Sequence, residues 1–529
     1  MKNILYIMLS MAVVTSISCR KLDVPVESQY VKGNFPTTQG DYAALFGTMY
    51  SNLSSQFGVP YWRMQELSTD EAILPARDGN FDDGGQFRQL HYHTWTIDHP
   101  SVRDIWQWGF GGINNCNRLI NLTNDSKASA ADKAAKIAEV KAMRALYYFF
   151  MMDLYGNVPI IESFPVVDQP ANVNRDKVFD FIEAELKAVL PDLPVKSSTN
   201  NVLLYGRPTK AMAFALLEKM YLNSEVYTGK PRYTDAVVMA DSILKGDNYK
   251  LDNNYYNLFD VNNGPQVQGT IFAIPYDQQI PGNQMTRFGF YAYLAPAYGI
   301  NVGFSIAMST TPEFYNRFNL AGDVRKNSWL IGKQYLPNVA DRSPDLTKPI
   351  FYSGTTNQIE ILPDLTLKPG KPMDLGNTLA DQAKGIRSIK YFPDVNAIQS
   401  TRVNGNDMPL FRLADVMLMK AEAIFRGAIA TTVNGELQTP MILINKVRAR
   451  AGAELATNVT LKSLLDDRAR EFSWEAWRRN DLIRYGKFEI DYLLPNDVLT
   501  MNKDVTRRLF PIPANELKLN SKLVQNPGY

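Results

Sequence analysis

A chain of 529 residues, 45% of them hydrophobic, is long enough to bury a large core, and length alone allows roughly three or four domains. Its formal charge of +2 creates no basic field over such a length, which argues against nucleic acid as a partner. No apolar run after the N-terminal segment has the length of a transmembrane helix.

The N-terminal segment has the layout of a secretory signal. Lys2 precedes an apolar run from Ile4 to Val14, and small polar residues lead to Cys19. Cys19 resembles the lipidated cysteine of bacterial lipoproteins, which predicts a signal peptide at 1–18 and a lipidated N-terminus with a polar tether at 19–38. The alternative is a plain exported protein cut near residue 18. If Cys19 is acylated, Cys116 is the only cysteine left with a free thiol, so no internal disulfide is expected.

The first half of the chain has the periodicity of amphipathic helices. A helix begins near Gly40, and others are predicted from about residue 105 to 121 and over 131–155, 175–190, 209–227 and 233–244. The helix over 209–227 is apolar on two faces, so it needs neighbours on both sides. Paired helices with short connectors and sandwiched inner helices predict tetratricopeptide-like stacking.

From residue 253 to 409, Pro and Gly become dense and the helical periods shorten, which predicts a loop-dominated region with short strands. Helices return over 411–426, 439–451 and 461–485. Acids and arginines recur on the last of these at helical spacing, and their simplest interpretation is helix-surface or inter-helix ion pairs (Arg468, Glu471, Glu475, Arg478 and Arg479).

The stretch from Glu66 to Pro100 collects acids, arginines, aromatic residues and every histidine of the chain. No helix or strand period crosses residues 75–85, and three glycines there permit positive backbone angles, so we expect a structured loop. Aromatic rings beside polar groups suit a ligand with hydroxyls on its edges and C–H bonds on its faces, as a sugar has.

Five C-terminal segments together resemble the SusD/RagB family, nearest its starch-binding subgroup: RLADVMLMKAEAIFRG (412–427), INKVRARAG (444–452), DRAREFSWEAWRRNDLIRYGKF (467–488), LFPIPANEL (509–517) and QNPGY (525–529). The loop TDEAILPARDGNFDDGGQFRQLHYHTWTIDHP adds to the resemblance. It implies one all-α-dominated domain over 39–529, with about four tetratricopeptide-like units at 39–250, a loop-rich, mostly irregular part at 251–410, and C-terminal helices and tail at 411–529.

The resemblance also implies a function without catalysis. Such a protein is lipid-anchored at the outer membrane, faces the cell exterior, and delivers oligosaccharide or polysaccharide to a SusC-like TonB-dependent transporter. An α-glucan is the first expectation for the ligand. The alternatives are a peptide-binding lid of a peptide importer and a surface glycosidase that would use acids of the loop (Asp70, Glu71, Asp82 and Asp83).

Trp95 is the predicted stacking platform for a sugar ring, and Asp70 and Arg77 are the predicted hydrogen-bonding groups, with Asp98 as a weaker candidate. A core tryptophan and a loop-stiffening salt bridge are the alternative interpretations of these residues. The second half is expected to add aromatic residues, for which we name Tyr298 and Trp329; Tyr291 and Tyr293 also qualify.

No cofactor is expected. Asp78-x-Asn80-x-Asp82 begins like a calcium loop, but Asp83 stands where the loop requires Gly and Gln89 where it requires Glu. An irregular Ca²⁺ site from the same oxygens remains open. A strand would place His91 and His93 on one side as zinc ligands with His99, although no fourth ligand is evident.

Overall fold

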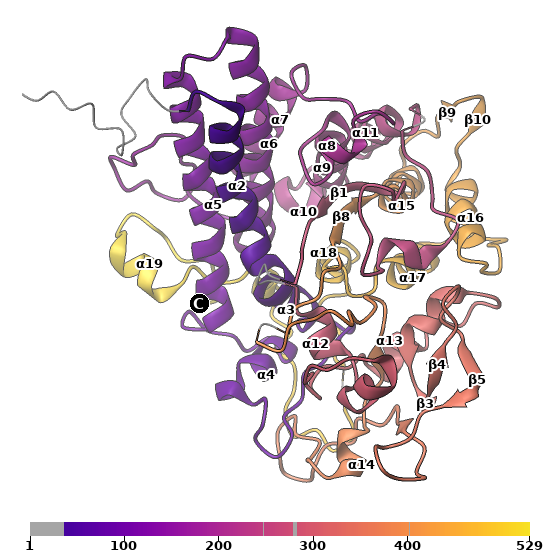
Figure 1. Ribbon diagram of the computed structural model, residues 1–529. Helices are drawn as coiled ribbons and strands as arrows, with labels where there is room; N and C mark the ends of the chain where they lie inside the picture. Colours follow the sequence, from indigo (N-terminus) through magenta and orange to yellow (C-terminus); the bar gives the residue numbers. More distant parts are fainter. Residues whose placement is uncertain (1–35, 247, 279–282, 401, 493) are drawn as a thin grey trace, which may run out of the picture.

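The computed structural model describes residues 36–246, 248–278, 283–400, 402–492 and 494–529. The predicted signal peptide, Cys19 and most of the tether lie outside these residues. Long helices lie side by side in the first half of the chain, whereas β3 (Gly332–Lys333), β4 (Tyr335–Pro337), β5 (Pro344–Pro349) and α14 (Leu379–Gln382) lie among loops at the lower end of the view in Figure 1.

The first half is helical, and its helices follow the apolar periods of the sequence. Its long helices are α2 (Gln39–Gln56), α5 (Pro100–Asp125), α6 (Ala130–Tyr155), α7 (Arg175–Val189), α9 (Lys210–Leu222) and α11 (Tyr233–Leu244). Its short helices are the π-helix η1 (Phe57–Tyr61), α3 (Trp62–Glu66), the 3₁₀ helix η2 (Asp83–Gly85), α4 (Gln86–His91), α8 (Asn201–Leu204) and α10 (Ser224–Thr228).

These helices pack as neighbouring pairs, which gives the predicted tetratricopeptide-like, helix-dominated fold. α5 packs against α2 and α6, α6 against α7, and α9 against α11, which in turn packs against a helix of the second half. The helix predicted over 209–227 ends earlier, because the Asn223 side chain donates to the Lys219 carbonyl at 2.8 Å and a separate turn, α10, follows. Among the described helices, none has both the length and the apolarity that crossing a membrane requires.

The second half begins with short elements joined by loops, as predicted. They are η3 (Tyr255–Leu258), β1 (Thr270–Ile274), α12 (Met285–Gly289), η4 (Ala292–Tyr298), α13 (Pro312–Tyr315), η5 (Val324–Ser328), β2 (Trp329–Leu330), β3 (Gly332–Lys333), β4 (Tyr335–Pro337), β5 (Pro344–Pro349), β6 (Glu360–Ile361), α14 (Leu379–Gln382), β7 (Arg387–Ser388) and β8 (Met408–Arg412). The strands form two-stranded antiparallel pairs: β1 with β8, β2 with β7, β3 with β6 and β4 with β5.

Helices return at the C-terminal end and complete the stack. They are α15 (Leu413–Phe425), α16 (Pro440–Arg450), α17 (Leu461–Phe472), α18 (Arg478–Arg484), η6 (Val505–Arg508) and α19 (Ala514–Leu519), with a small hairpin of β9 (Thr432–Val433) and β10 (Glu436–Leu437). α15 packs against α11 and α16, so the C-terminal helices continue the layers begun by the first half.

The helix predicted over 461–485 is broken between α17 and α18. Within this break, Trp474 and Ala476 have φ angles of 58° and 65°, which are uncommon for residues with side chains. Two carboxyl groups from the end of α3 and the loop after it bind the backbone here: Glu66 accepts from the Ala476 N–H at 2.6 Å, and Glu71 accepts from the Trp474 N–H. These bonds fix a turn that local sequence preference does not favour.

Asp70 lies beside this turn and joins the two ends of the chain. It accepts from Arg478 Nε and Nη2 at 2.8 and 2.7 Å and from Arg317 Nη2 at 2.9 Å. Burial alone would raise the pKa of Asp70, but the two guanidiniums lower it below its ordinary value. The prediction that Asp70 binds a sugar is therefore contradicted: its carboxylate is 3% exposed and fully engaged in the core.

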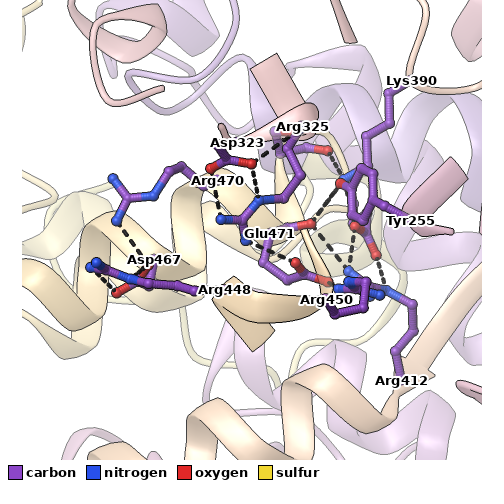
Figure 2. A network of polar contacts seen from close by, with 12 residues as sticks. Tyr255, Asp323, Arg325, Lys390, Arg412, Arg448, Arg450, Asp467, Arg470 and Glu471 are labelled. Atoms are coloured by element: carbon purple, nitrogen blue, oxygen red, sulfur yellow. Dashed lines mark hydrogen bonds and ion pairs between the residues drawn. The ribbon is translucent and has the colours of Figure 1, made fainter. Parts of the chain in front are cut away.

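Of the five residues expected to form ion pairs, Arg468, Glu471, Glu475 and Arg478 pair with residues of helices, strands and loops, and these pairs are buried rather than on the surface. Arg479 instead donates to the carbonyls of Arg507 and Arg508. Figure 2 shows Glu471 of α17 at the centre of one network. It accepts from Arg325 at 3.0 Å, from Arg412 at 2.8 Å and from Arg450. Burial would raise the pKa of Glu471, but these arginines hold it far below its ordinary value. The network ties η5, β8 and α16 to α17.

Trp95 also belongs to the core, contrary to its predicted role as a stacking platform. It is 1% exposed, its ring lies 4.5 Å from that of Phe510, and its Nε1 donates to the Tyr529 hydroxyl at 2.6 Å. A ring covered on this scale offers no face to a ligand. Trp95 instead anchors the LFPIP and QNPGY segments of the C-terminal tail.

Replacing Asp70 with Ala leaves Arg478 buried without its carboxylate, so we expect the free energy of unfolding to fall by about 3–5 kcal/mol. Urea denaturation followed by circular dichroism measures this loss. Asp104→Ala is the control, because its pair with Arg103 is largely exposed and its removal should cost less than about 1 kcal/mol. Equal effects of the two substitutions would contradict a central structural role for Asp70.

Replacing Trp95 with Ala removes a large buried ring, and we expect a loss of about 3–5 kcal/mol in the free energy of unfolding. The same denaturation experiment measures it. Trp95→Phe retains most of the packing and should lose less. An unchanged unfolding midpoint in Trp95→Ala would show that the ring does not support the core.

Candidate functional site

The loop after Leu74 is held in a defined shape, as the sequence predicts. Arg77 and Asn80 exchange backbone hydrogen bonds of 2.8 and 3.1 Å, and the Asp78 N–H donates to Asp374 Oδ1 at 3.0 Å. Phe81, at the end of this turn, is half-buried and has a φ of 63°. A bulky residue in the left-handed region is unusual and often marks a functional loop.

Arg77 lies beneath this loop rather than on its surface. It is 1% exposed and donates to the carbonyls of Asp381 and Lys384, at and just after the end of α14. Arg387 donates to the carbonyls of Gln382 and Gly385 in the same turn. Burial lowers the pKa of Arg77 to about 10 and that of Arg387 to about 9. Arg77 is therefore too buried to contact a ligand, contrary to the prediction. Its guanidinium instead holds α14 in position.

Three tyrosines form a cluster that contacts α14 through Tyr293, and we call Tyr291, Tyr293 and Tyr352 the tyrosine platform. Tyr291 is fully buried and supports the other two rings, so only Tyr293 and Tyr352 reach the surface. The ring of Tyr293 lies 5.5 Å from that of Tyr291 and 5.4 Å from that of Tyr352, and Tyr293 is 38% exposed. Its hydroxyl donates to Gln382 Oε1 at 2.8 Å. Gln382 belongs to the turn that Arg77 and Arg387 hold, so the loop and the platform share one support.

An open hollow of about 520 Å³ lies beside the loop, and its lining is polar. Asp78, Asp82 and Asp374 supply oxygens, while Arg88 and Lys371 supply donors. Asp82 pairs with Arg88, and Asp78 pairs with Lys368. Aromatic rings together with charged and amide groups at their edges can stack on a ligand and hydrogen-bond to it at the same time.

Tyr298 and Trp329 are the two predicted residues that the structure brings together. Both line a small cavity of about 190 Å³, separate from the hollow beside the loop. Trp329 is 5% exposed, and its ring packs edge-on against Trp474 at 5.7 Å. Asp98, the remaining candidate, is exposed in the turn before α5. Asp70, Arg77 and Trp95 each occupy a different part of the core.

The three histidines are buried in α4 and in the turns that follow it. The strand expected to align His91 and His93 is absent, because His91 ends α4. Burial lowers the pKa of His91 to about 4 and that of His93 to about 3, so both are neutral. Within the described ranges, no group of three or more His, Cys, Asp or Glu side chains is arranged to hold a metal ion.

Phe81 counts among the aromatic residues of the loop in the sequence but is not among the predicted site residues, and neither are Tyr352 and Gln382. The glycines around Phe81 and its position between acids were the available signal. Tyr352 and Gln382 contact Tyr293 only in the folded chain, and no local sequence pattern predicts these contacts.

Comparison with known proteins agrees with this fold. The family model described as "SusD family" matches residues 237–529, more than half of the chain, and one described as "Starch-binding associating with outer membrane" matches residues 49–222. The starch-binding protein SusD of Bacteroides thetaiotaomicron is 29% identical over 423 residues, which cover 73% of this chain and 71% of that protein.

Solved structures share the architecture. Surface glycan-binding protein A of Bacteroides thetaiotaomicron, in complex with laminarihexaose, matches with a TM-score of 0.69 and 21% identity over 93% of this chain and 100% of that one. Surface glycan-binding protein A of Bacteroides fluxus matches with a TM-score of 0.72 and 18% identity over the same shares. From the matched family model, the shared helix stack and the relatives, we conclude that this chain belongs to the SusD family.

Proposed function

We propose that the protein is a non-catalytic, lipid-anchored glycan-binding protein of the outer membrane that captures oligosaccharide on the tyrosine platform and delivers it to a SusC-like TonB-dependent transporter. The exposed Tyr293, hydrogen-bonded to Gln382 of α14, carries this proposal. Membership of the SusD family and relatives named for starch, surface glycan and laminarin binding support it.

The geometry favours sugar recognition for a physical reason. A sugar ring presents C–H bonds on its faces and hydroxyls on its edges, so a tyrosine ring can cover one face without removing the hydroxyls from polar partners. Gln382, which Tyr293 contacts, supplies such a partner. Starch and laminarihexaose, named for two relatives, are both built from glucose, so a glucan is the ligand class we propose.

The same geometry favours binding over hydrolysis. A glycosidase needs two carboxyl groups that flank the bond to be broken. Of the four acids considered for that role, Asp70 and Glu71 are buried in the core and Asp82 is paired with Arg88, so the exposed Asp83 has no second free carboxyl group among them. Recognition without bond cleavage is therefore the chemistry we assign to this surface.

Tyr293→Ala tests the platform directly. Removing a stacked ring should weaken glycan binding by about 1 kcal/mol, or roughly fivefold in Kd. A glycan-array screen of residues 20–529 identifies the ligand, and calorimetry of the wild type and the variant measures the loss. Phe425→Ala is the matched control, because Phe425 is 41% exposed but lies at the end of α15, away from α14 in Figure 1.

Two outcomes would contradict this assignment. Equal glycan affinity in Tyr293→Ala and the wild type would place the ligand elsewhere on the molecule. A well-folded protein that binds no glycan on the array, yet binds oligopeptides, would replace the proposed function with peptide capture.

Cys19→Ala tests the anchor, which lies outside the described residues. Loss of the acylated thiol should move the protein from the membrane fraction to the soluble fraction, since two or more buried acyl chains hold a protein firmly at a bilayer. Palmitate labelling detects the acyl group, and fractionation detects whether the protein is attached to the membrane. A labelled, membrane-bound Cys19→Ala protein would refute lipidation at this residue.

A further inference from the structure

Arg63 of α3 lies between two phenylalanine rings where α3, α4 and α12 meet (Figure 1). Its Cζ is 5.1 Å from the centre of the Phe87 ring in α4 and 4.9 Å from that of the Phe288 ring in α12. Contacts of this kind hold the face of a guanidinium and leave its N–H edges available for hydrogen bonds. The Arg63 side chain is half-buried, and its N–H groups donate to no other residue in the part of the chain that the structure describes.

Arg287 of α12 shares the Phe288 ring with Arg63. Its Cζ lies 5.1 Å from the ring centre, and its Nη1 donates to Gln284 Oε1 at 2.8 Å. Burial lowers the pKa of Arg63 to about 10, and the positive charge of Arg287 contributes to this shift. Burial and the positive charge of Arg402 in turn lower the pKa of Arg287. Three half-buried arginines therefore lie close enough to repel one another.

We call Arg63, Arg287 and Arg402 the arginine cluster, and its charge is not neutralised from within the fold. Among the described residues, none of the three forms an ion pair with a carboxylate. Asp83 favours the charged form of Arg63 from a distance, but its own side chain is exposed on η2. Holding like charges together away from bulk water is unfavourable unless an opposite charge accompanies them. An anion taken from solution is the partner that this cluster lacks.

We propose that the arginine cluster is a binding site for a tetrahedral oxyanion with two negative charges, either sulfate or phosphate. The edge of a stacked guanidinium presents parallel N–H groups that match the oxygen spacing of such an ion. Three positive charges favour a doubly charged ion over a singly charged carboxylate. The site is independent of the glycan-binding function proposed above, because it contains no residue of the tyrosine platform.

An anion in this position joins α3 to α12. The last part of α12 is already fixed, since the Ser305 N–H donates to the Arg287 carbonyl at 2.9 Å. Tyr291 and Tyr293 follow α12 directly in the chain. The anion therefore gives a further support to the segment that carries the tyrosine platform.

Calorimetric titration of the purified protein with sodium sulfate, sodium phosphate and sodium acetate, at constant ionic strength, tests the site. We expect saturable binding of sulfate or phosphate that is about tenfold tighter than binding of acetate, because of the second negative charge and the additional oxygens. Comparison of sulfate with phosphate shows which of the two ions the site prefers.

The unfolding temperature gives a second readout, because an ion that binds only the folded protein stabilises it. Sulfate and phosphate also stabilise proteins in general through their exclusion from the protein surface. The specific part of the stabilisation is therefore the difference between the wild type and a variant of the cluster in the same salt.

Arg63→Gln and Arg402→Gln, made separately, should each weaken sulfate or phosphate binding about tenfold. Arg402→Gln keeps the test decisive if Arg63→Gln disturbs the packing of the two rings, because the Arg402 side chain makes no ring contact or hydrogen bond among the described residues. Arg118→Gln is the matched control. Arg118 is also half-buried and donates to Asn115 at 3.0 Å, but it lies on α5, outside the cluster, so its replacement should leave anion binding unchanged.

Three results would overturn the site: no saturable binding of sulfate or phosphate, equally tight binding of acetate, or unchanged binding of both ions in Arg402→Gln. An equal loss of binding in Arg118→Gln would also overturn it, because the attraction would then come from overall charge rather than from the arginine cluster. None of these results depends on whether Tyr293→Ala weakens glycan binding, so the oxyanion site and the proposed function fail separately.

Discussion

Two carboxyl groups near the start of the fold hold a strained turn near its end, and much of the structure depends on this contact. Glu66 and Glu71 accept the backbone N–H groups of Ala476 and Trp474, which adopt left-handed conformations between α17 and α18. Asp70, between them, pairs with Arg478. Residues about 400 positions apart are thereby locked together, so the helical half and the C-terminal helices fold as one body.

This lock also explains the position of the candidate site. The loop that follows Glu71 leaves the core in a fixed direction, and its Arg77, together with Arg387, binds the carbonyls at the end of α14. Gln382 of α14 meets Tyr293. Buried arginines thus support α14 and the exposed Tyr293, and rigid support lowers the entropy lost when a ligand is bound.

The helices could be predicted because burial leaves a period in the sequence: α6, α7 and α11 begin and end within one residue of their predicted bounds. The breaks at Asn223 and between α17 and α18 could not, since they depend on a side-chain cap and on distant carboxylates. The site was predicted in its region but not in its residues. Trp95 and Tyr293 are both uncharged aromatic residues, so residue type does not tell which one is exposed. Tertiary packing alone places Trp95 in the core and Tyr293 on the surface.

Hydroxyl-radical footprinting with mass spectrometry, performed with and without the glycan identified on the array, tests the central claim most directly. It measures the solvent exposure of individual rings, so it separates core aromatics from binding aromatics. The structure predicts that glycan protects Tyr293 from oxidation and leaves Trp95 slowly oxidised in both states. Protection that appears at Trp95, with Tyr293 unchanged, would contradict the division between a structural core and a tyrosine binding surface.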